Sequence, residues 1–245
     1  MLRSAKSLYG YLVKARDGDT GKVYDFFFDD EKWKIRYLVV ETGGFLSGRK
    51  VLIAPVVLGT PDWKTRHFPV ALTKNQIESS PDIDVHKPIS RRLELELHRY
   101  YKWNPYWPVA GVDVESPVVP SPGADTPEEQ KKDEKDYHLR SMKEITGYRI
   151  HASDGEIGHI DDIVIEGDKL NVRYIVVDTK NWIPGRRVLL SRGWIRDIDW
   201  SGKEVIMDLD RNDIKNSPEY DPSRPVNREY EEVLYDFYGR PKYWL

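Results

Sequence analysis

The sequence predicts a mainly β protein with some α-helix, built as two tandem small antiparallel β-barrels, each followed by a short and then a longer helix. Three observations predict this fold class. The chain repeats itself at a fixed spacing of 137 residues, β-branched and aromatic runs separated by turn residues begin each copy, and capped amphipathic segments end it. The chain is therefore predicted to contain two copies of one unit, in which strands come first and helices follow.

The internal repeat sets the domain organisation. Residues 3–107 align with residues 140–244 without a gap and share 35 identities in 105 positions, far more than unrelated chains of average composition. We expect a first copy at residues 1–107 and a second copy at residues 140–245. Residues 108–139, between them, hold five prolines and a run of charges, a composition that is typical of a linker.

The strands of each copy are predicted from short runs rich in β-branched and aromatic residues, bounded by Gly, Asp or Asn. In the second copy, apolar residues also alternate around Ser201 and Gly202, as in a hairpin, whereas Pro61 and Pro69 limit the equivalent hairpin of the first copy to an edge. Five or six short antiparallel strands make a small barrel or rolled sheet. The runs cover residues 9–16, 22–28, 34–40 and 50–53, and residues 148–152, 159–165, 171–178 and 187–190.

Two helices are predicted at the end of each copy. Thr73 and Gln76 fit a capping box, and Asp210 begins the equivalent turn in the second copy. These short helices end before a proline. A longer helix should begin after Ser90 and after Asn227, because both are good caps and the apolar residues that follow are spaced by three and four.

The central strand at residues 35–40 is apolar on both faces from Tyr37 to Val40, although a barrel strand that faces water on one side should alternate. Something must therefore cover its outer face. The sequence leaves two candidates open, the long helix of the same copy and the other barrel.

Composition and charge exclude several classes of protein. With 39% apolar residues and a net charge of −3 over 245 residues, the chain can build cores. No apolar run approaches the ~18 residues of a membrane span, so we expect no membrane span and a cytoplasmic location. Residues 1–107, 108–139 and 140–245 carry net charges of +5, −5 and −3; the +5 of the first copy is weak support for nucleic-acid binding, and a solvated surface of mixed charge is the better interpretation.

No residue pattern points to catalysis, a metal or a cofactor. Cysteine is absent, and the six histidines are scattered. The "DGDTG" and "DGEIG" stretches that begin at Asp17 and Asp154 run directly into strands, so they fit hairpin turns better than calcium or phosphate loops. We therefore expect a protein that is not an enzyme and has no cofactor.

Two motifs that occur in both copies are candidates for partner binding. One is a loop with a large aromatic residue followed by Gly-Arg, and the arginine could instead cap loop carbonyls or pair with Glu41 and Asp178. The other is a Tyr-Trp pair in the tail after the long helix, which could instead clamp that helix to the barrel. Aromatic residues beside arginine are typical of interaction hot spots. The candidate partner-binding residues are Phe45, Arg49, Trp182, Arg186, Tyr106, Trp107, Tyr243 and Trp244.

The block "GYLVKARDGDTGKVYDFFFDDEKWKIRYLVVETGGFLSGRKVLI" and the ending "LTKNQIESSPDID" resemble the PRC-barrel family, named from the cytoplasmic domain of the photosynthetic reaction-centre H subunit and also found in a ribosome-maturation factor. The resemblance covers about residues 3–85 and 140–222. It is similar to the stand-alone tandem bacterial type and implies a small barrel used as an adaptor or assembly platform, without a general catalytic motif.

The functional expectation is a non-enzymatic adaptor or assembly module that binds an unknown protein partner through tandem barrels. We expect the two copies to form an intramolecular pseudo-dimer, or the chain to form a homodimer. The alternatives are binding of RNA or ribonucleoprotein through the first copy, and a small-molecule or metal-dependent enzyme at the interface between the barrels.

Overall fold

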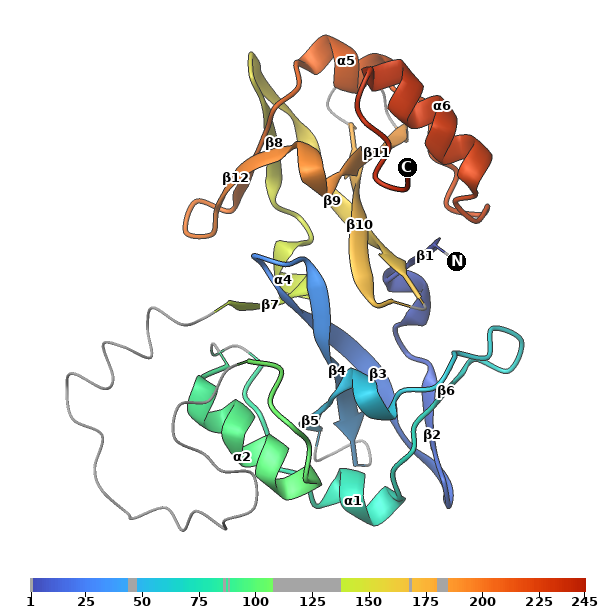
Figure 1. The fold of residues 1–245 in the computed structure, drawn as a ribbon, viewed down its shortest axis with the longest axis vertical. Helices are drawn as coiled ribbons and strands as arrows, with labels where there is room; N and C mark the ends of the chain where they lie inside the picture. The colour runs from blue at the N-terminus through green and yellow to red at the C-terminus, as the bar shows by residue number, and fades with distance from the viewer. Residues whose placement is uncertain are drawn as a thin grey trace, which may run out of the picture.

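The computed structural model describes residues 2–43, 48–85, 87, 89–107, 138–167, 169–179 and 185–245. In this part of the chain the fold is predominantly β, with helices packed on the outside (Figure 1). Thirteen strands form one connected sheet, whose main path runs from β12 at one end to β6 at the other and does not close. The sheet is mixed, so the expectation of two purely antiparallel barrels is corrected.

Each copy contributes one set of strands that matches the sequence prediction in place and order. The long central strands of the two copies cover equivalent residues, and both end in a tight turn. The strands of the first copy are β2 (Leu12–Ala15), β3 (Gly18–Asp29), β4 (Lys34–Thr42), β5 (Arg49–Ile53) and β6 (His67–Pro69). Those of the second are β8 (Arg149–Ala152), β9 (Gly155–Glu166), β10 (Asn171–Asp178), β11 (Arg187–Ser191), β12 (Ile195–Asp199) and β13 (Glu204–Met207).

The parallel pairs arise at the last strand of each copy. Strand β6 pairs in parallel with β2, and β13 pairs in parallel with β8. Between β2 and β6 the chain runs through β3, β4, β5 and the 3₁₀ helix η2 (Pro55–Val57), and between β8 and β13 it runs through β9, β10, β11, the 3₁₀ helix η3 (Arg192–Trp194) and β12. A parallel pair needs such a crossover, whereas a short turn permits only the antiparallel arrangement.

The helices follow the predicted caps. Thr73 and Gln76 form the capping box of α1 (Lys74–Glu78), and Asp210 caps α5 (Arg211–Asn216). The longer helices are α2 (Arg91–Tyr101) and α6 (Arg228–Tyr238), which Ser90 and Asn227 cap through hydrogen bonds to the third residue of each helix. These side chains satisfy backbone N–H groups that have no partner within the helix.

The long helix of the same copy covers the outer face of the central strand. Tyr37 and Val39 on β4 belong to an apolar cluster with Leu97 on α2, while Leu38 and Val40 point into the main core. In the second copy, Tyr174 on β10 meets α6 in the same way. The other copy is therefore not the cover, and the apolar outer face is no reason for the copies to associate.

The two copies nevertheless exchange short strands that the sequence analysis did not identify. Strand β1 (Leu2–Ser4) lies at the start of the first copy but pairs with β9 of the second, with Leu2 opposite Glu166. Strand β7 (Leu139–Ser141) lies at the start of the second copy but pairs with β3 of the first. Both strands read Leu-Arg-Ser, and β7 begins at the last residue of the predicted linker. Figure 1 shows each strand beside the opposite copy.

Equivalent residues of the two copies also meet at a central contact. Lys34 on β4 lies opposite Asn171 on β10, and these two positions correspond in the repeat. Ile35 N donates to the Leu170 carbonyl and Val172 N to the Trp33 carbonyl, both over 2.8 Å. The contact is thus symmetric about a local twofold axis.

One apolar core runs through both copies. Phe26 and Phe28 of the first copy and Ile163 and Ile165 of the second belong to the same buried cluster. Contiguous burial of this kind is the main favourable term in folding. Among the described residues, no helix is both long and apolar enough to cross a membrane.

Candidate functional site

The arginines of the predicted loop motif close the ends of the short helices. Arg49 donates to the carbonyl of Glu78 over 2.6 Å and to that of Ser80 over 2.8 Å. Arg186 donates to the Ser217 carbonyl over 2.5 Å. Helix carbonyls at this end have no partner inside the helix, so a cationic side chain stabilises them. Both arginines therefore bind backbone carbonyls, but at the end of the following short helix and not in the loop where capping was expected.

The other expectations for this motif concern the partner of Glu41 and the two loop aromatics. Lys50, not Arg49, reaches Glu41, with 3.2 Å between its Nζ and Oε1. Phe45 and Trp182, the loop aromatics, lie outside the described residues. Partner binding through this loop therefore stays a prediction.

The tail of the first copy folds back on its own helix. The Tyr106 hydroxyl donates to Glu94 on α2 over 2.8 Å. The Trp107 ring lies 5.1 Å from the His98 ring, and the Arg91 guanidinium lies 4.6 Å from the Trp107 ring centre. Cation–π and edge contacts of this kind hold the tail against the helix.

The tail of the second copy repeats this arrangement. The Tyr243 hydroxyl donates to Glu231 over 2.7 Å, and the Trp244 ring lies 5.1 Å from the Tyr235 ring. Arg228 lies 4.1 Å from the Trp244 ring centre. Both Tyr-Trp pairs therefore act as clamps between helix and barrel, one of the two roles that the sequence left open.

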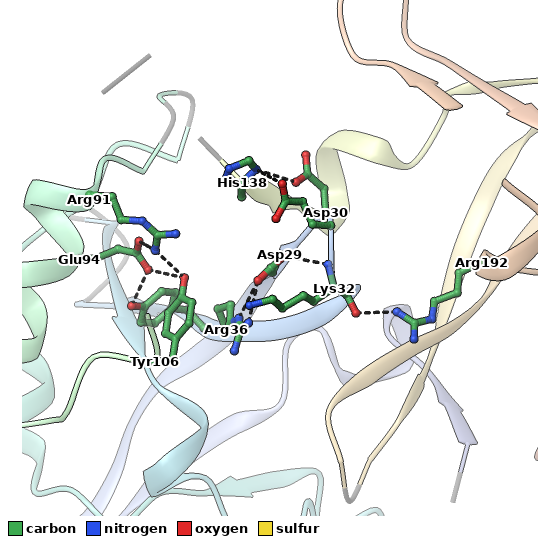
Figure 2. A network of polar contacts seen from close by, with 11 residues as sticks. Asp29, Asp30, Lys32, Arg36, Arg91, Glu94, Tyr106, His138 and Arg192 are labelled. Atoms are coloured by element: carbon green, nitrogen blue, oxygen red, sulfur yellow. Dashed lines mark hydrogen bonds and ion pairs between the residues drawn. The ribbon is translucent and has the colours of Figure 1, made fainter. Parts of the chain in front are cut away.

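A buried glutamate joins helix, tail and barrel in the first copy. Glu94 accepts from Tyr37 on β4 over 2.9 Å, from Tyr106 in the tail, and from Arg91 over 2.6 Å. The His98 ring lies 3.0 Å from the Tyr37 hydroxyl. Figure 2 shows Arg91, Glu94 and Tyr106 converging from α2 and the tail. Three elements are thus tied through one carboxyl group.

Burial controls the electrostatics of this cluster. It raises the pKa of Glu94 above its usual range, although hydrogen bonds from Tyr106 and Tyr37 and the charge of Arg91 act in the opposite direction. Burial also raises the pKa of Tyr37, and the nearby Glu94 charge raises it further. A buried carboxylate is tolerated only where donors and a cation surround it, as they do here. The chemistry is that of a structural anchor.

The second copy contains the same cluster around Glu231. It accepts from Tyr174 over 2.6 Å and from Tyr243, and Arg228 lies 3.0 Å away. Burial, with the hydrogen bond to Glu231, raises the pKa of Tyr243 to about 12. The duplication kept this buried group in both copies.

A second ion pair lies under each tail. Arg36 donates to Asp29 over 2.7 Å, and its guanidinium lies 3.9 Å from the Tyr106 ring centre. Arg173 likewise donates to Glu166 over 2.5 Å and stacks on Tyr243 at 4.2 Å. Burial raises the pKa of Asp29, but the hydrogen bonds from Arg36 and Lys32 outweigh it, so the net pKa is lowered.

The exchanged strands end at two buried aspartates. Asp25 accepts from the Ser141 hydroxyl over 2.5 Å and from Lys143 N over 3.2 Å, while Asp162 accepts from Ser4 and from Lys6 N in the same manner. A bulge just before each aspartate redirects its side chain toward the incoming strand. Burial raises the pKa of Asp25 to about 6 and raises that of Asp162 as well.

The aspartates of the two Asp-Gly turns also have structural partners. Asp17 accepts from Lys74 N and Asp154 from Arg211 N, each over 2.8 Å, so both bind the first residue of a short helix. Gly18 and Gly155 have φ of 135° and 137°, as the predicted hairpin turns require. No group of three or more His, Asp or Glu residues in the described ranges could hold a metal ion.

The buried carboxylates are organising residues that were not among the candidates predicted from the sequence. One signal could have found them: Glu94 and Glu231 are identical in the two copies and lie within the apolar stripe of the long helix. Asp25 and Asp162 are also identical and lie inside apolar strands. A charged residue kept at a buried position in both copies indicates a satisfied internal partner.

Comparison with known protein families identifies a domain within the first copy. A family model described as PRC-barrel domain matches residues 3–62, which is less than half of the chain. No curated protein matches the chain. Residues 3–62 therefore contain a PRC-barrel domain.

Proposed function

We propose that this chain is a non-enzymatic adaptor that binds a protein partner through two tandem PRC-barrels, held together as an intramolecular pseudo-dimer. The reciprocal strand exchange carries the proposal. Each copy receives one short strand from the start of the other copy, and Asp25 and Asp162 bind those segments. Such an arrangement makes a rigid two-part platform.

The second barrel is supported by strand order and register. Strands β8, β9, β10 and β11 succeed one another as β2, β3, β4 and β5 do, and the bulges fall at equivalent residues. The buried glutamate, the tail clamp and the helix caps also recur. These shared contacts favour the same PRC-barrel architecture for the second copy.

The outer face of α6 is the proposed partner surface. Val233 is 58% exposed and Phe237 is 42% exposed, one helical turn apart on the side of α6 opposite to the barrel. At the equivalent positions α2 has Glu96 and Tyr100, and the Tyr100 hydroxyl donates to the Gln76 carbonyl. The apolar pair therefore occurs in one copy, which favours one partner per chain.

Charge around this pair indicates the chemistry of the partner. Glu229, Glu232 and Asp236 are exposed on the same helix. An apolar pair between acidic residues suits an amphipathic segment with a basic rim, since complementary charges guide association and large side chains supply the affinity. The same acidic residues disfavour RNA as the partner, because they would repel its phosphates.

The pseudo-dimer is tested by cutting the linker in the folded chain. A protease site inserted within residues 108–137 permits cleavage without touching either copy. The two pieces should stay together as a 1:1 complex in size-exclusion chromatography at micromolar concentration, because the exchanged strands and shared core remain. Separate elution of two folded pieces would show that the copies are independent.

The partner surface is tested by crosslinking with a matched control. The double variant Val233→Glu and Phe237→Glu should lose the crosslinked partner while its unfolding free energy changes by less than about 0.5 kcal/mol. Leu12→Glu, at another exposed apolar residue on β2, should keep the partner. The proposal would be contradicted if both variants lost the partner or if neither did. Salt-sensitive capture of RNA in place of protein would also contradict it.

A further inference from the structure

The local twofold axis relates equivalent positions of the two copies, and at one pair of these positions the surroundings differ. Arg3 on β1 and Arg140 on β7 occupy equivalent positions in the exchanged strands. The guanidinium of Arg3 lies 4.5 Å from the Trp63 ring centre, and that of Arg140 lies 4.3 Å from the Trp200 ring centre. Both arginines therefore present the same stacked geometry.

The surroundings of Arg140 are closed. Its Nε donates to Asp30 over 3.1 Å, and His138 lies 3.6 Å from the same carboxylate. Beside this pair, Arg192 donates to the Lys32 carbonyl over 2.6 Å and bridges the two copies. Figure 2 shows Asp30 with His138, and Arg192 with Lys32, on either side of the β3–β4 turn. The arginine charge is thus neutralised within the protein.

The counterpart of this site lacks each closing group. Gly167 stands where the first copy has Asp30, so no side chain reaches toward Arg3 from this position. Pro55 stands in place of Arg192, which removes the bridge between the copies. Leu170 replaces the larger Trp33. Three substitutions thus remove both the carboxylate and the bulk that fill the other site.

A cavity of about 530 Å³ lies at this open site, lined by residues of both copies. Its walls are mainly apolar and include Leu58, Trp63 and Phe68 from the first copy, with Leu170 from the second. Arg3 also lines it, and Arg3 Nε is buried without a hydrogen-bond partner. Among the described residues none forms an ion pair with Arg3. A buried donor without a partner is costly, so a ligand that supplies an acceptor gains affinity.

We propose that this cavity binds a small amphipathic carboxylic acid. The carboxylate bonds to Arg3 and takes the place that the Asp30 carboxylate occupies beside Arg140. The apolar body lies against Trp63 and Phe68, in a cavity of the size that holds small molecules. Arginine matches a planar carboxylate well, because its donors form a fixed fork. This site is separate from the outer face of α6 and does not depend on the adaptor proposal.

The full chain is tested by calorimetry with 2-naphthoate and octanoate, each compared with the neutral alcohol of the same carbon skeleton. We expect at least one carboxylate to bind about tenfold or more tightly than its alcohol, since a hydrogen bond to a charged group contributes that much. Absence of carboxylate binding at millimolar concentration would overturn the proposal, as would equal affinity for acid and alcohol.

Two variants locate the site, and a third serves as control. Arg3→Leu should weaken carboxylate binding at least about tenfold and leave alcohol binding within about twofold. Gly167→Asp restores the residue of the other copy, and it should abolish carboxylate binding while raising thermal stability. Arg140→Leu, at the closed site, should leave the affinity unchanged. Carboxylate binding that survives Gly167→Asp, or that Arg140→Leu removes, would place the ligand elsewhere and refute the assignment.

Discussion

The two copies are most alike in their buried contacts. They differ most where the exchanged strand of one copy meets the turn between the two central strands of the other. Their buried carboxylates, Glu94 and Glu231, hold the same helix and tail with the same types of partner. At the ends of the exchanged strands, by contrast, Asp30 closes one side and Gly167 leaves the other open. The comparison teaches that folding constrains the satisfied interior equally in both copies. The periphery of the twofold contact is free to diverge.

Removal of the buried glutamates should have the largest effect and should separate the copies. Glu94→Ala leaves Tyr37 and Arg91 without their acceptor and should destabilise the protein by about 4 kcal/mol. Glu231→Ala should destabilise it less, by about 3 kcal/mol, because Arg228 is 49% exposed and can be hydrated, whereas Arg91 is 23% exposed. Urea unfolding measures both. Equal values would show that solvation of the arginine does not matter.

Gly158, on β9 of the second copy, should be almost as sensitive. A Cβ at Gly158 would lie 2.2 Å from the Asp178 carbonyl oxygen, at a φ of 155°. Gly158→Ala should therefore destabilise the protein by about 3 kcal/mol, because the backbone of β10 must move. Gly147→Ala is the control, since its φ is 94° but no atom lies near its Cβ, and we expect about 1 kcal/mol. A smaller loss at Gly158 than at Gly147 would contradict this order.

The aspartate at the strand exchange should make stability depend on pH. Burial raises the pKa of Asp25 from its ordinary value of 3.8 to about 6 in the folded protein. Between these two pH values the folded state therefore binds a proton that the unfolded state does not. This contribution to stability is present below about pH 4 and is lost as pH rises through about 6. Asp25→Asn should remove about 2 kcal/mol of the decline between pH 4.5 and pH 7. An unchanged decline in urea unfolding would mean that another group carries it.

The smallest effect should come from converting the closed site into a copy of the open one. Asp30→Gly removes the carboxylate from Arg140, and it should destabilise the protein by about 1 kcal/mol because the pair is partly exposed. The same variant should acquire weak binding of the carboxylate that occupies the open site. Calorimetry of Asp30→Gly combined with Arg3→Leu isolates the new site. No binding there would show that the bulk of Trp33 or Arg192 closes it instead.

The local structure of this protein was determined by its sequence. Apolar runs bounded by Gly and Asp gave β3, β4, β9 and β10 in their correct places, since residue preferences and turn chemistry act over a few neighbours. Thr73, Ser90, Asp210 and Asn227 marked the helix starts for the same reason. The repeat also showed that an element predicted in one copy should recur at the equivalent residues of the other.

The tertiary structure alone decided how the copies join and which charges are buried. Leu-Arg-Ser at residues 2–4 and 139–141 is too short to predict a strand, and nothing local shows that each pairs with the opposite copy. The different settings of Arg3 and Arg140 depend on Gly167 and Asp30, more than a hundred residues away along the chain in each case. Strand pairing and desolvation depend on contacts that form only when the whole chain folds. A sequence pattern over a few neighbours does not contain them.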